Sequence, residues 1–96
     1  MLNELKKELQ ITYEDPDVDQ RLQRYLREGQ AYLKGKVGLD IDCTTDENKP
    51  LLFAYCRYAF HHALEHFQKN YHHDIVSLRK REAIRHYASK SRESNL

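Results

Sequence analysis

The sequence predicts an all-α protein: a small bundle of about four helices with a long central third helix and a flexible basic C-terminal tail. Apolar residues recur three and four positions apart through most of the chain, and no segment alternates as a strand does. Three Gly and two Pro residues in 96 leave little material for long irregular loops. This length suits one domain, which we assign to residues 1–88, followed by a disordered tail at 89–96.

The first two helices have clear start signals. Leu2, Leu5 and Leu9 recur at i, i+3 and i+7, which predicts a short helix followed by a turn. Asp15 and Pro16 then predict the start of a second helix, because Asp caps exposed N–H groups and Pro fits the first helical turn.

The second helix is predicted from about residue 16 to residue 36, with its apolar residues inside one arc. Gly29 lies near the middle of that arc, and a glycine there costs about 1 kcal/mol relative to alanine. We therefore expect another helix to approach closely at Gly29. Gly38 supplies the stop signal.

The third helix is predicted from about residue 49 to residue 69, after a polar connection at 38–48. Its apolar residues cover about half of its circumference, which is wider than contact with one neighbour requires and indicates a central helix. They are Leu52, Phe53, Tyr55, Cys56, Ala59, Phe60, Ala63, Leu64 and Phe67.

The fourth helix is predicted from about residue 75 to residue 88, with Asp74 as its cap. Its apolar residues fall on two sides, which indicates two packing partners or a bend. Ile75 and Leu78 form one side, and Val76, Ala83 and Tyr87 the other.

The charges nearly cancel, with 16 basic and 15 acidic residues, so the net charge does not indicate nucleic acid or membrane binding. Their distribution is uneven, however: residues 1–50 carry a net charge of −3 and residues 75–96 a net charge of +4. This asymmetry suits head-to-tail assembly or a basic end that meets an acidic partner, and it also suits a plain solvated helix face. No uncharged run exceeds seven residues, which is too short to span a bilayer. The charged N-terminus and two lone cysteines predict a cytoplasmic protein.

Histidines suggest metal chemistry at first sight. His62, Glu65 and His66 match the His-x-x-Glu-His pattern of inverted zinc peptidases. The short downstream chain offers little room for a third ligand, and the two rings suit the edge of the apolar face. Incidental metal binding by the histidines is favoured over a catalytic zinc and would not be a function; the residues are His61, His62, His66, His72 and His73. A pH switch is a weaker alternative. Cys56 falls within the apolar arc, which predicts an inert thiol. We predict no catalytic, cofactor-binding or metal-ligating residue.

Tyr58 falls on the otherwise polar face of the third helix, and exposed tyrosines are favoured at protein–protein contacts. We therefore predict a subunit interface lined by Tyr58, His61 and Glu65, with the acidic face of the second helix on one side of the contact. The basic residues Arg79, Arg81, Arg85 and Lys90 are predicted to dock to a partner or to line a channel.

The chain resembles the small head–tail connector proteins (adaptor or head-completion proteins) of tailed bacteriophages and prophages of Gram-positive bacteria. The resemblance covers residues 2–88. It rests on Leu5-Lys-Lys-Glu-Leu-Gln-Ile11, Asp17-Val-Asp19, Arg57-Tyr-Ala-Phe-His-His-Ala-Leu-Glu-His-Phe67, Asn70-Tyr71 and Asp74-Ile-Val-Ser-Leu78.

The resemblance implies a non-enzymatic virion protein that needs no cofactor. Such a protein forms a ring beneath the portal protein, contacts a stopper or tail-completion protein, and surrounds DNA only as the contents of its channel. It would be located at the capsid–tail junction after assembly in the host cytoplasm, without membrane contact. The alternative is a small helical DNA-binding or regulatory protein that uses the C-terminal basic cluster.

Overall fold

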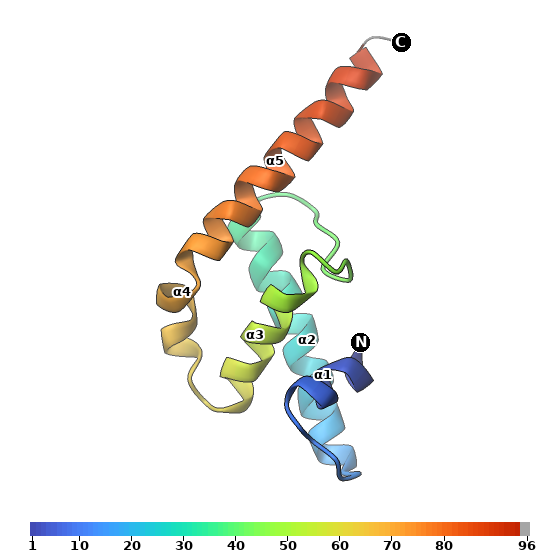
Figure 1. Cartoon of the computed structure of the whole chain (residues 1–96), viewed down its shortest axis with the longest axis vertical. Coiled ribbons are helices and arrows are strands. Elements are labelled where there is room, and N and C mark those ends of the chain that lie inside the picture. The colour runs from blue at the N-terminus through green and yellow to red at the C-terminus, as the bar shows by residue number, and fades with distance from the viewer. Residues whose placement is uncertain (95–96) are drawn as a thin grey trace.

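The computed structural model describes the backbone of residues 1–94 and the side chains of residues 1–88. It confirms the predicted all-α class, because these residues form helices and contain no strand. The elements are α1 (Leu2–Glu8), α2 (Pro16–Val37), α3 (Lys49–Phe60), the 3₁₀ helix η1 (Leu64–His66), α4 (Phe67–Asn70) and α5 (His72–Ser94). Figure 1 shows α1, α2 and α3 packed together, with α5 passing the C-terminal end of α2 and extending beyond the other helices toward the C-terminus.

Helix α2 has the boundaries that its sequence predicts. The Asp15 carboxylate accepts a hydrogen bond of 3.0 Å from the backbone N–H of Asp17, and Pro16 occupies the first turn. At the other end Gly38 adopts a left-handed conformation with φ 76°, and its N–H bonds to the carbonyl of Lys34. Local capping therefore fixes both ends of α2.

Helices α2 and α3 pack most extensively, and Gly29 is where they come closest. A Cβ atom at Gly29 would lie 2.7 Å from Leu52 Cδ1 and 2.8 Å from Tyr55 Cδ1. Both side chains are buried, at 0% and 8% exposure. The structure thus confirms the predicted close approach at this glycine.

Helix α3 begins where predicted but ends at Phe60, nine residues before the predicted end. His62 adopts φ 56°, and the Ala63 N–H bonds to the Tyr58 carbonyl at 2.8 Å. The His62 N–H bonds to the Ala59 carbonyl at 3.1 Å, which completes a Schellman stop. The helical spacing of apolar residues continues past this stop, which is why periodicity alone placed the end too late.

Helix α5 also differs from its prediction. It begins at His72, so Asp74 lies in its first turn rather than at its cap, and it continues to Ser94. Ile75 and Leu78 are buried against the body at 3% and 1% exposure. The second apolar side, beyond the half-buried Val76, stays uncovered.

Candidate interaction surfaces

Two arginines of the predicted docking cluster pair with acidic residues of the same chain. Arg81 Nε lies 2.9 Å from Glu47 Oε1, and Arg85 donates to Glu47 Oε2 at 3.0 Å. Arg85 also donates to Glu82 at 3.2 Å. The hydrogen bond to Glu47 is the main reason that the pKa of Arg85 lies above its usual value. Glu47 therefore links the start of α3 to the middle of α5.

A buried asparagine completes this link. Asn48 is 1% exposed, and its Nδ2 donates to the backbone carbonyl of Asp42 at 2.8 Å. Its Oδ1 accepts a 2.7 Å hydrogen bond from Arg81. Buried polar groups of this kind are costly unless they are hydrogen-bonded, so the contacts hold the loop before α3 against α5.

The predicted docking residues therefore differ in exposure and in their contacts within the chain. Arg79 is exposed, whereas Arg81 and Arg85 contribute to the α3–α5 link, and the side chain of Lys90 lies outside the described residues. Their role in docking stays a prediction. Sequence reasoning missed the link because Glu47 and Arg81 are 34 positions apart, and no local pattern indicates that they meet.

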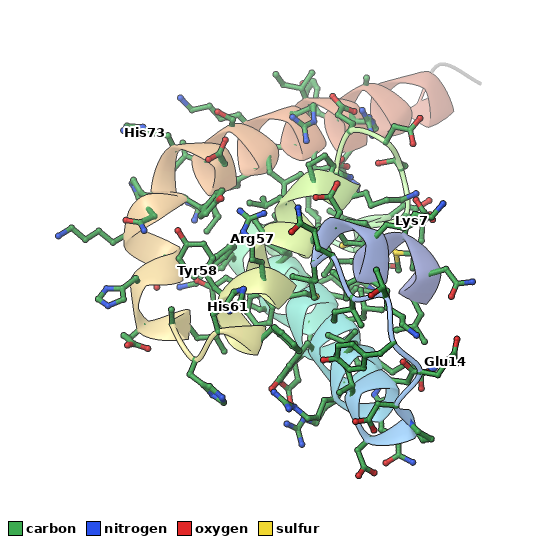
Figure 2. The ribbon with its side chains drawn as sticks, turned by 60° about the horizontal axis from the view of Figure 1, so that its bottom comes forward. Lys7, Glu14, Arg57, Tyr58, His61 and His73 are labelled. Atoms are coloured by element: carbon green, nitrogen blue, oxygen red, sulfur yellow. The ribbon has the colours of Figure 1, made fainter. Side chains whose placement is uncertain are left out.

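Tyr58 is not the exposed tyrosine that the helical pattern predicts. It is half-buried, and its hydroxyl accepts a 2.9 Å hydrogen bond from Asn70 Nδ2. Figure 2 shows its side chain directed from α3 toward the following segment. Its ring lies 5.7 Å from that of Phe67 and 5.5 Å from that of Tyr71, edge to face in both cases. The shortened α3 explains the difference, because the chain turns back and covers Tyr58.

Phe67 is the centre of this aromatic cluster and is only 1% exposed. Its ring centroid lies 5.0–5.7 Å from four tyrosine rings, a separation typical of favourable aromatic pairs. The four are Tyr32, Tyr55, Tyr58 and Tyr71. Four of the seven tyrosines of the chain thus pack around Phe67 and help to fix the α3–α5 connection.

His61 and Glu65, the other two predicted interface residues, are exposed on the connection after α3. Figure 2 shows His61 at the end of α3. Helix α3 ends at Phe60, before both His62 and His66, and His66 lies in the separate helix η1, so these histidines do not occupy one helical face as the peptidase pattern requires. Among the described residues no three His, Cys, Asp or Glu side chains group closely enough to hold a metal ion. Cys56 is fully buried, and burial raises its pKa to about 12.

The outer face of α2 is not acidic beyond its first turn, contrary to the prediction. Arg21, Arg24 and Arg27 recur at three-residue spacing and line a surface hollow of about 460 Å³. Arg21 lies over the Phe60 ring at 5.4 Å, and Arg24 pairs with Glu28 at 3.6 Å. An acidic α2 face therefore cannot form one side of a subunit contact over its whole length.

An open groove of about 950 Å³ lies between α1 and α3 and reaches the start of α5. Leu51, Phe53, Ala54 and Tyr71 contribute apolar surface to it. Five carboxylates and three cations surround this surface, a net charge of −2. They are Glu4, Glu8, Asp46, Glu47 and Asp74, and Lys7, Lys49 and Arg57. Figure 2 shows Lys7 on α1 and Arg57 on α3, the two helices that form the groove.

The part of α5 that projects from the body carries exposed apolar side chains. Ile84 is 70% exposed and Tyr87 77% exposed. With Lys80 and Ala83 they stand at i, i+3, i+4 and i+7, so all four share one helical face. The apolar side predicted from the sequence included Ala83 and Tyr87 but not Ile84, although the same helical spacing places Ile84 beside them.

No known family model, curated protein or solved structure matches this chain. Within the described residues, no helix combines the length and apolar character needed to cross a bilayer. Inferences about function therefore rest on the residues and surfaces described above.

Proposed function

We propose that this chain is a structural subunit of a ring that connects the portal of a bacteriophage capsid to the tail and extends the DNA channel. Its partners are the portal protein, a stopper or tail-completion protein and further copies of itself. The chain acts by assembly, without a catalytic centre or cofactor. It is located at the capsid–tail junction of the virion after assembly in the host cytoplasm.

The observation that carries the proposal is the projecting end of α5 with its exposed Ile84 and Tyr87. Isolated apolar residues are common on protein surfaces, but two on one face of a projecting helix suit a helix that packs against a partner. The pairing of Glu47 with Arg81 and Arg85 supports this, because it holds α5 in one direction relative to the body. The resemblance of residues 2–88 to head–tail connectors supplies the identity of the assembly.

Electron microscopy of the purified chain mixed with the portal encoded beside its gene tests the proposal. We expect a ring on the axis of the portal, and a portal from an unrelated phage serves as the control. The absence of both a ring and a portal complex would contradict the proposal. The neighbouring genes offer a second test, because we expect them to encode portal and capsid proteins.

The alternative, a small DNA-binding or regulatory protein, depends on the same basic cluster of α5. Arg81 and Arg85 are paired with Glu47 and Glu82 inside the chain, which leaves less positive charge for phosphates. A mobility-shift assay at physiological salt separates the two functions. Nanomolar, sequence-dependent DNA binding would favour the alternative.

A further inference from the structure

The acidic groove and the projecting end of α5 are complementary in charge and in polarity. The groove has an apolar floor. Apart from Glu47, which is already paired with Arg81 and Arg85, four carboxylates and three cations line it, a net charge of −1. In the α5 segment 79–87, Arg81 and Arg85 are paired with Glu47 and Glu82 of the same chain. Outside these pairs the segment carries two exposed cations, Arg79 and Lys80. Glu82 is only 8% exposed and lies on the inner side, so the outward surface of this segment is basic and apolar.

The two surfaces cannot meet within one chain. Ile75 and Leu78 are buried under α5, and Arg81 and Arg85 join it to Glu47. These contacts fix the inner side of α5 against the body, so the face with Ile84 points away from it. Figure 1 shows the helix continuing away from α1 and α3. Only another molecule can therefore bring this face to the groove.

We propose that the α5 face formed by Lys80, Ala83, Ile84 and Tyr87 docks into the α1–α3 groove of a second copy of this chain. Ile84 and Tyr87 cover the apolar floor at Leu51 and Ala54, and Lys80 faces the carboxylates on the rim. Two α5 helices would instead bring basic residues together, which disfavours a symmetric contact through this helix.

The inference deepens the proposed function and rests on it for the closure of the assembly. A contact between two different surfaces is heterologous, so each added copy presents a new groove and a new helix. Such a series ends in a ring when the rotation between neighbours closes, and otherwise in a filament. Groove docking thus supplies the contact between neighbouring subunits that a ring requires.

Disulfide trapping between two variants tests the contact in the full chain. One variant carries Ile84→Cys on α5, and the other carries Lys7→Cys at the groove. Gln23→Cys on the exposed side of α2 replaces Lys7→Cys as the matched control. The native Cys43 and Cys56 are 3% and 0% exposed and stay out of the reaction. At about 1 mM chain, a contact with a Kd of about 1 mM is substantially occupied.

We expect the mixed disulfide of I84C with K7C to form in clear excess over that of I84C with Q23C. Equal yields of the two would overturn the inference. Circular dichroism of each variant before mixing establishes that it is folded. Because no portal is present, a negative result here leaves the portal experiment unaffected, and the reverse also holds.

Charge reversal gives a second readout that random collision would not produce. Lys80→Glu in the I84C chain should lower the mixed-disulfide yield about two- to fivefold, the size expected of one surface ion pair. Glu8→Lys in the K7C chain should then restore it. If neither Lys80→Glu nor Glu8→Lys alters the mixed-disulfide yield, the electrostatic part of the contact is refuted.

Discussion

The contact between α2 and α3 can be tested with two glycines of the same helix. Gly29 faces α3, where an added Cβ would lie 2.7 Å from Leu52 and 2.8 Å from Tyr55. Gly35 lies six residues later on a different face of the helix, and a Cβ there meets nothing within 4 Å. Alanine therefore brings a gain in helix propensity at both positions, smaller at Gly35 because it lies in the last turn of α2, but a steric conflict only at Gly29.

The magnitudes separate the two effects. Alanine favours a helix interior over glycine by about 1 kcal/mol, so Gly35→Ala should raise the free energy of unfolding by up to about that amount. Overpacking a core costs about 1–3 kcal/mol, so Gly29→Ala should be neutral or destabilising by up to about 2 kcal/mol. Leu52 and Tyr55 cannot easily move aside, because both are buried and the Tyr55 ring lies 5.4 Å from the rings of Tyr32 and Phe67.

Urea unfolding followed by circular dichroism measures both variants against the parent chain. The difference between the two isolates the steric term, which we expect near 2 kcal/mol, or about 8–16 °C in Tm for a chain of this size. If Gly29→Ala stabilises the chain as much as Gly35→Ala does, the result would contradict a close contact between α2 and α3 at Gly29.

Three further predictions concern the stop after α3, the aromatic cluster and acid sensitivity. His62→Gly should stabilise the chain by about 1 kcal/mol in urea unfolding, because glycine avoids the cost of a left-handed φ of 56°. The neighbouring His61→Gly, at φ −95°, should bring no such gain. Phe67→Ala should cost about 3–5 kcal/mol, and the half-buried Phe60→Ala clearly less; equal losses would contradict the central place of Phe67. The Thr44 side chain and backbone N–H hold the pKa of Asp42 below its usual 3.8. Because the folded chain favours the charged carboxylate, this contribution is present above the usual pKa and is lost as pH falls below it. Asp42→Asn should therefore flatten the acid side of the stability–pH curve, and an unchanged curve would refute this role.

The sequence alone predicted the helices wherever the signal was local. Asp15, Pro16 and Gly38 mark the ends of α2, and these are capping interactions that depend on only a few neighbouring residues. Gly29 indicated a close helix contact because a glycine in an apolar arc is unfavourable without one. The two-sided pattern of α5 predicted two packing partners or a bend, and in the structure only its Ile75 and Leu78 side is buried.

The tertiary structure decided where α3 ends, which the apolar spacing that continues after Phe60 could not indicate. The chain folds back at His62, so Phe67 and Tyr71 enclose Tyr58 instead of extending α3. An apolar stripe has the same period whether its helix continues or breaks.

The candidate surfaces also depend on contacts between distant parts of the chain. Sequence reasoning grouped Arg79, Arg81, Arg85 and Lys90 as one basic cluster, whereas the fold uses Arg81 and Arg85 to hold α5 against Glu47. The sequence by itself determined the helical class, the caps of α2 and the charge asymmetry, because these follow from residues close together in the chain. Only the tertiary structure decided which charges stay on the surface and which apolar face remains uncovered, because burial and pairing depend on residues brought together by folding.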